Sequence, residues 1–141
     1  MSVTETPNTR TSLLRVAQLL ICSWRLAQHS TTTSAVPVLP DHGDLALDRA
    51  LERAASAGLL PAWAAEALHF ADGQAGRVCV ELLDVMAWAG AGGLVEYSTN
   101  DRGFHVLVSP AMAGRFLERL GVTVEEARRL GEFLAMEVAG P

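Results

Sequence analysis

The sequence predicts a predominantly helical domain that carries one small β-hairpin. Apolar residues recur at helical spacing over most of the 141 residues, as expected for amphipathic helices packed around a core. Half of the residues are hydrophobic and 19% are charged, so the chain is too apolar for a disordered segment and long enough to bury a core. Residues 94–108 instead combine two short β-prone runs with a turn, and they predict the hairpin.

The first predicted helix spans Thr9 to His29, and its apolar side chains point in nearly every direction around the axis. A helix of that kind must be covered on several sides, so we expect it to lie in the core of a homodimer. A polar loop that contains prolines follows over residues 30–43. Five further helices are expected over residues 44–58, 61–70, 74–89, 110–120 and 123–138.

Capping residues mark most of these helix boundaries. Asp44 is a favoured N-cap, and Gly58 is a favoured residue just beyond a helix end. Residues 71–73, Ala-Asp-Gly, predict a tight turn before the fourth helix. Ser109 followed by a proline predicts the start of the fifth helix, and residues 123–126, Thr-Val-Glu-Glu, form a capping box for the last.

The net charge of the chain limits how it could bind a nucleic acid. The formal net charge is −5, and all eleven basic residues are arginines. An acidic chain does not coat nucleic acid non-specifically, so DNA binding would require a local basic patch.

The cysteines and the hydropathy pattern predict a cytoplasmic protein. Cys22 and Cys79 lie in apolar stretches predicted as helices, which favours buried free thiols in a reducing compartment. The most apolar stretch, residues 16–24, is flanked by arginines and is too short to span a membrane. The polar, acidic start of the chain does not resemble a signal peptide.

From Asp44 to Val108, the predicted order of helices and hairpin resembles a winged helix-turn-helix. Residues 93–97 (GLVEY), 100–103 (NDRG) and 106–111 (VLVSPA) resemble the wing of the MarR family of transcription regulators, and residues 60–68 (LPAWAAEAL) are similar to its first helix-turn-helix helix. The resemblance implies a winged-helix core flanked by terminal helices that form a homodimer. It also implies DNA as a partner and is compatible with a small-molecule effector.

In such a regulator, the second helix of the motif lies in the major groove and the wing approaches the minor groove. The helix predicted over residues 74–89 would be the one that lies in the major groove. The candidate DNA-binding residues are therefore Gln74 and Arg77 at the start of that helix and Asn100 and Arg102 at the tip of the hairpin.

The charges of the same segment support a different function. Residues 59–108 hold two arginines and six carboxylates, and carboxylates on a groove-facing helix would oppose DNA phosphates. The alternative is a winged-helix-derived module that does not bind DNA and docks a protein through Glu81, Asp84 and Trp88, by imitating the charge of DNA. Trp24 and Trp63 are expected in the core.

No cofactor, metal or enzymatic activity is expected. His42 lies near Asp41 and Asp44, and His69 lies near Asp72, but neither spacing is typical of a metal site. The sequence holds no recognisable catalytic motif.

Overall fold

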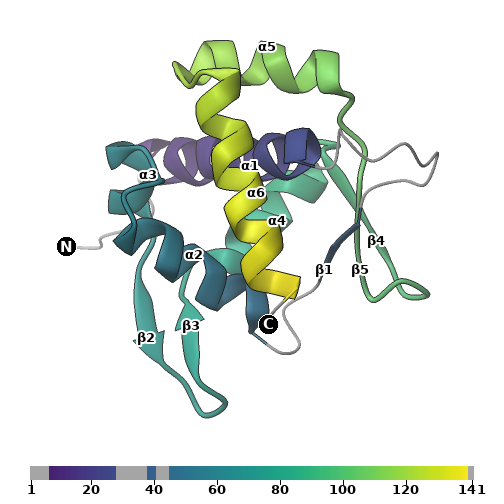
Figure 1. Ribbon diagram of the computed structural model, residues 1–141. Coiled ribbons are helices and arrows are strands. Elements are labelled where there is room, and N and C mark those ends of the chain that lie inside the picture. The colour runs from purple at the N-terminus through teal and green to yellow at the C-terminus, as the bar shows by residue number, and fades with distance from the viewer. Residues whose placement is uncertain (1–6, 28–37, 41–44, 140–141) are drawn as a thin grey trace.

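The computed structural model describes residues 7–27, 38–40 and 45–139, which are mostly helical with two small antiparallel sheets (Figure 1). The elements in chain order are α1 (Pro7–Ala27), β1 (Val38–Pro40), α2 (Ala46–Ser56), α3 (Ala62–Ala67), β2 (Phe70–Asp72), β3 (Arg77–Cys79), α4 (Leu82–Ala91), β4 (Val95–Ser98), β5 (Gly103–Val106), α5 (Pro110–Leu120) and α6 (Val124–Ala139). The predicted fold class, mainly helical with a small hairpin, is confirmed at this level.

Helix α1 lies at the centre of the fold, and its apolar surroundings come from the chain itself. It packs against α3, α4, α5 and α6, and Figure 1 shows α6 crossing over it. Side chains on several faces of α1 are buried, among them Leu13, Leu20 and Ile21. This helix therefore does not need a second copy to cover it, and the reason for expecting it in a dimer core is lost. The homodimer stays a prediction.

The α1–α6 crossing depends on a glycine. A Cβ atom at Gly131 of α6 would collide with the backbone carbonyl of Ser23 and lie 3.0 Å from the Cβ of Ala27, both on α1. Because Gly131 has no side chain, the two helices can approach closely enough to exclude solvent between them. The terminal helices of this chain thus pack on each other.

The predicted hairpin is confirmed as β4 and β5, and it belongs to a three-stranded sheet. Strand β1 pairs antiparallel with β5, which gives the strand order β1-β5-β4. Gly103 permits this pairing, because a Cβ atom there would lie 2.6 Å from the carbonyl oxygen of Leu39. Residues 38–40 were expected within a loop, and that prediction is wrong.

The prediction that a helix begins at Gln74 is also wrong. Strands β2 and β3 form a second antiparallel hairpin, and α4 begins only at Leu82. Gly76 in the turn has a φ of 140°, a backbone conformation that is incompatible with an α-helix and that side-chain-bearing residues rarely adopt. The tight turn predicted over residues 71–73 is also misplaced, because Ala71 and Asp72 belong to β2. The turn of this hairpin instead joins Gly73 to Gly76 through their backbone groups.

Helix boundaries that depend on local caps match the prediction. The Ser109 hydroxyl accepts a hydrogen bond from the Met112 amide at the start of α5. The α3 helix ends at Ala67 instead of Phe70, because β2 begins there. His29, Asp44 and the His42 group lie outside the described residues.

Candidate functional site: an acidic cleft beside α3 and α4

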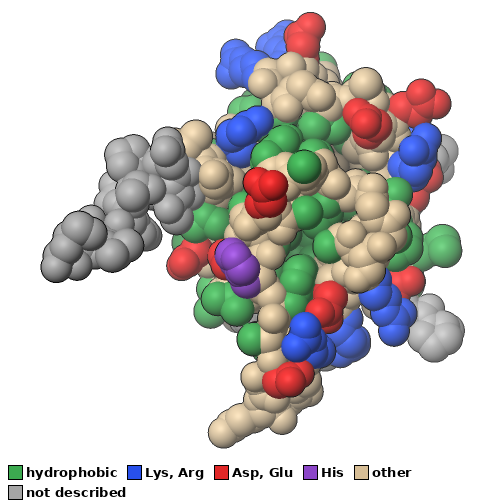
Figure 2. Space-filling view, turned by 90° about the vertical axis from the view of Figure 1, so that its left-hand side faces the viewer, with side chains coloured by type: hydrophobic (Ala, Val, Ile, Leu, Met, Phe, Trp, Pro, Cys, Tyr) green, Lys and Arg blue, Asp and Glu red, His purple; other side chains and the backbone are tan. Residues whose placement is uncertain are grey.

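A cleft of about 540 Å³ opens between the start of α1, α3 and the base of the β2–β3 hairpin. On the face shown in Figure 2, acidic side chains and a histidine lie among hydrophobic ones. The cleft is lined by Ser12, Leu13, Trp63, Glu66, Ala67, His69, Val80, Glu81 and Asp84. It therefore combines three carboxylates with an aromatic and an aliphatic wall.

His69 and Glu81 hold the rim of the cleft together. The Glu81 carboxylate accepts a hydrogen bond from the His69 amide at 2.7 Å, and its second oxygen lies 2.5 Å from Nδ1 of the same residue. The Val80 amide donates to the His69 carbonyl oxygen, so the two chain segments also pair through their backbones. Glu81 thus closes the base of the hairpin at the point where α4 begins.

The other two carboxylates form no ion pair, although the Arg15 guanidinium lies over the ring of Trp63, which lines the cleft. Glu66 on α3 and Asp84 in the first turn of α4 are exposed and make no hydrogen bond or ion pair with another described residue. Unpaired charges of one sign beside low-dielectric walls attract a ligand of the opposite sign. The cleft therefore favours a positively charged group.

Its walls favour a ligand with an apolar portion. Val80 is 56% exposed, so it offers apolar surface to a ligand in the cleft. Trp63 forms the aromatic wall, and the Arg15 guanidinium lies over its ring, 4.3 Å from the centroid. The indole already binds one cation in this way, and that contact helps to fix its orientation.

Two of the four candidate DNA-binding residues lie on the β2–β3 hairpin. Gln74 is exposed in the turn, and Arg77 lies in β3 and not on α4. The Arg77 guanidinium contacts the Glu52 carboxylate through two nitrogens, at 2.6 and 3.3 Å, and Asp72 at 3.2 Å. These contacts raise the pKa of Arg77, and the hydrogen bonds from Arg77 lower the pKa of Glu52. The positive charge of Arg77 is therefore engaged within the protein.

The other two candidates lie at the tip of the β4–β5 hairpin. Asn100 and Arg102 are exposed, and Arg102 adopts a positive φ of 51° in the turn. Between them, Asp101 contacts the His105 ring at 2.6 Å. Figure 1 shows the two hairpins on different sides of the helices, so the structure does not bring the four candidates together.

The candidates for protein docking are only partly assembled. Glu81 and Asp84 line the same cleft, but Trp88 does not and is half-buried against the core. The aromatic residue of the cleft is Trp63, which is half-buried and also packs against the core, where it was expected. Trp24, by contrast, is buried as predicted, and its indole nitrogen donates to the Val38 carbonyl oxygen at 3.1 Å.

Sequence reasoning did not identify His69 as the partner of Glu81, nor Glu66 as a residue of the same cleft. The signal that could have found them lies in residues 70–80, where a turn between short β-prone runs is compatible with a hairpin as well as with a helix. With the hairpin recognised, its two ends bring His69 and Glu81 together. The metal pairing of His69 with Asp72 does not form, because Asp72 contacts Arg77.

The described residues hold no cluster of metal-ligating side chains. No group of three or more histidines, cysteines and carboxylates is arranged to hold a metal ion there. Cys22 and Cys79 are buried and free, although Cys79 lies in β3 and not in a helix. Burial raises the pKa of each thiol to about 12, so both are protonated at neutral pH.

Comparison with known proteins does not assign a family. No protein-family model matches the chain, and neither the curated proteins nor the solved structures include a significant match. Among the described residues, no helix combines the length and the apolar character that a membrane span requires.

Proposed function

We propose that this protein is a binding module that docks a basic segment of another protein in the acidic cleft. The observation that carries the proposal is the pair of carboxylates without an ion pair, Glu66 and Asp84, beside Trp63 and the exposed Val80. An arginine or lysine side chain matches both features, because its charged head pairs with carboxylates while its stem covers apolar surface.

The rest of the rim supports the same occupant. Glu81 is held by His69 and does not need to reorganise when a ligand arrives, which reduces the entropic cost of binding. The net charge of −5 also attracts a basic partner over long distances, mainly by increasing the association rate at low salt. We therefore expect binding that weakens as the salt concentration rises.

A DNA-binding transcription regulator with a winged helix-turn-helix core is the second candidate. It is supported by the hairpin β4–β5, which follows α4 directly, pairs with β1 and carries the exposed Arg102 at its tip. It is opposed by Asp84 on α4 and by the engagement of Arg77 with Glu52. The DNA-binding regulator, whose DNA contacts would include Arg77, is therefore the weaker of the two proposed functions.

The test uses fluorescein-labelled peptides and fluorescence anisotropy on the full chain. The probe is a short peptide with two arginines flanked by leucines, and the comparison peptide has glutamates in place of the arginines. We expect the basic peptide alone to bind. The double variant Glu66→Gln/Asp84→Asn should weaken binding at least about tenfold, since charge-assisted contacts contribute ~1.5–3 kcal/mol each.

The matched control is Glu118→Gln on α5, an exposed carboxylate outside the cleft, which should leave the affinity unchanged. A labelled random-sequence DNA duplex forms the second arm at two salt concentrations. Equal binding of both peptides, or loss of affinity in the Glu118 variant as large as in the double variant, would refute the proposal. A DNA shift that is lost in Arg102→Ala would favour the regulator instead.

A further inference from the structure

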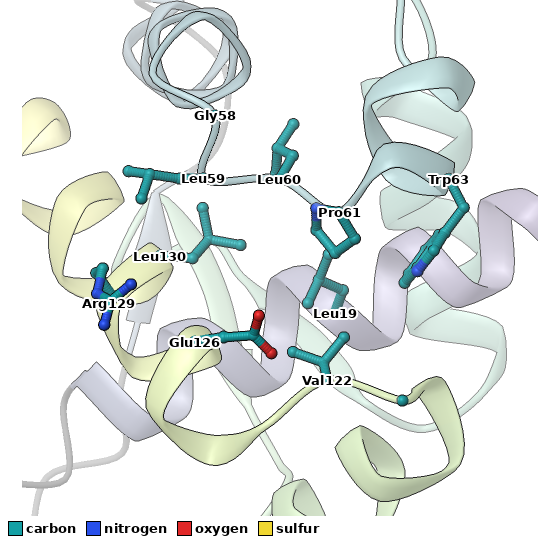
Figure 3. Close-up of a pocket in the computed structure, with 11 residues that line it drawn as sticks. Leu19, Gly58, Leu59, Leu60, Pro61, Trp63, Val122, Glu126, Arg129 and Leu130 are labelled. Atoms are coloured by element: carbon teal, nitrogen blue, oxygen red, sulfur yellow. The ribbon is translucent and has the colours of Figure 1, made fainter.

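A second cavity lies on another part of the surface, between α1, the connection from α2 to α3, and the junction of α5 and α6 (Figure 3). Its volume is about 170 Å³. Its lining combines the aliphatic side chains of Leu19, Leu59, Leu60, Val122 and Leu130 with polar surface, to which Glu126 and Arg129 contribute. A cavity of roughly 150 Å³ can hold a benzene molecule, so this volume is enough for one small side chain.

One carboxylate is directed into this cavity. Figure 3 shows the Glu126 carboxylate pointing between Leu19 and Val122. Its Oε1 atom accepts hydrogen bonds from the amide and hydroxyl of Thr123, at 3.0 and 3.1 Å, in the capping box of α6. Its Oε2 atom makes no hydrogen bond with the described residues. The hydrogen bonds from Thr123 lower the pKa of Glu126, which keeps the group ionised at neutral pH.

One guanidinium lines the same cavity. Arg129 lies three residues further along α6 and makes no ion pair or hydrogen bond with another described residue. The cavity thus has one anionic and one cationic group beside aliphatic side chains. Both charged groups are exposed, and the charge of Arg129 helps to lower the pKa of Glu126. A ligand that is only an anion or only a cation would therefore meet one group of its own sign at this site.

We propose that this cavity binds a free α-amino acid with a branched or aromatic apolar side chain. The ammonium group would donate to Oε2 of Glu126, the carboxylate would accept from the Arg129 guanidinium, and the side chain would fill the space among the leucines. This ligand is a zwitterion, so it matches both charges and the aliphatic side chains. The site shares Trp63 with the acidic cleft and has no other lining residue in common with it, and the inference does not depend on the proposed docking function.

Trp63 provides a spectroscopic reporter, because it lines both this cavity and the acidic cleft. A ligand that fills the cavity would change the environment of its indole ring. A fluorescence response and a heat of binding that are both lost in Glu126→Gln but retained in Glu66→Gln/Asp84→Asn would place the ligand in this cavity and not in the acidic cleft.

The experiment titrates the full chain by calorimetry and tryptophan fluorescence with L-leucine and L-phenylalanine. The comparison ligands are 3-methylbutylamine, which lacks the carboxylate, 4-methylpentanoate, which lacks the amine, and glycine, which lacks the side chain. We expect at least one of the two amino acids to bind, each truncated analogue to bind at least about tenfold more weakly, and glycine not to bind. Absence of binding by both amino acids at about 10 mM would overturn the proposal.

Glu126→Gln provides the decisive variant, because glutamine can keep the capping box while removing the charge. We expect it to weaken amino-acid binding roughly tenfold to a hundredfold. Glu125→Gln is the matched control, since Glu125 is exposed, precedes Glu126 on α6 and does not line the cavity. Wild-type affinity in Glu126→Gln, with circular dichroism and thermal unfolding unchanged, would overturn the proposal, as would equal affinities for leucine and 4-methylpentanoate.

Discussion

The β2–β3 and β4–β5 hairpins have strands of similar length but are held in the fold by different interactions. Hairpin β4–β5 gains a third strand, because β1 pairs with β5 along Val38–Pro40. Hairpin β2–β3 has no third strand among the described residues and contacts α2 instead. There, the buried Asp48 carboxylate accepts a hydrogen bond from the Cys79 amide at 2.8 Å, and Glu52 contacts Arg77.

This difference shows why the acidic cleft depends on α2. A two-stranded hairpin is marginally stable by itself, so side chains from α2 must hold β2 and β3 in place. His69 and Glu81, at the two ends of this hairpin, form the rim of the cleft. Residues that never touch the cleft are therefore expected to control its geometry.

The largest effect is expected from Asp48→Ala. Removal of the carboxylate leaves the buried Cys79 amide without its acceptor, and we expect a loss of about 2–4 kcal/mol in the free energy of unfolding. Chemical denaturation measures this loss, and hydrogen exchange locates it. The Cys79 amide should lose protection while amides in β4 and β5 retain theirs.

Asp48→Asn is the control for that experiment, because its amide oxygen can still accept from Cys79. It should retain more of the protection than the alanine variant. Equal loss of protection in both hairpins of Asp48→Ala would mean that they unfold as one unit, and the contrast between them would be wrong.

A smaller loss of stability is expected from Gly103→Val, which tests the β4–β5 hairpin. A Cβ atom at this position would lie 2.6 Å from the Leu39 carbonyl oxygen and 2.8 Å from a methyl group of Val38. We expect a loss of about 1–3 kcal/mol, because β1 must move away from β5. In hydrogen exchange, β1 and β5 should lose protection and the Cys79 amide should not. Preserved protection in β1 would contradict this assignment.

The same contrast explains which features of the fold could be predicted from sequence. The start of α5 at Ser109 and the capping box of Thr123 and Glu126 involve residues at most three positions apart, so a local pattern specifies them. The β2–β3 hairpin depends on Asp48 and Glu52, which are 31 and 25 positions away from their partners. A local reading of residues 74–81 could not include those contacts.

The candidate site was predictable to the same extent. Glu81 and Asp84 were identified together because they share one face of the helix predicted over residues 74–89, although α4 begins only after Glu81. Trp63 and Glu66 join them only because α3 and α4 both pack on α1, and a short sequence pattern does not contain that information. The central position of α1 was missed for a similar reason: an all-apolar helix predicts burial, but it does not say whether one chain or two supply the cover.

The smallest expected effect concerns the ion pair between Glu52 and Arg77, which is exposed to solvent. Hydrogen bonds from Arg77 lower the pKa of Glu52 below its ordinary value of 4.5. A carboxylate whose pKa is lower in the folded protein stabilises the fold above its unfolded-state pKa, and this contribution is lost as the pH falls through the folded-state pKa. Glu52→Gln should therefore be slightly less stable than the wild type at pH 7.

This stability difference should shrink below pH 4.5 and be smaller in high salt, because exposed ion pairs are screened. Thermal unfolding of both proteins across that pH range measures it. Glu96→Gln on β4 is the matched control, since Glu96 is exposed on the hairpin that depends on strand pairing, and it should show no such pH-dependent difference. A Glu52→Gln difference that is constant with pH would mean that packing of the side chain, and not its charge, holds the β2–β3 hairpin against α2.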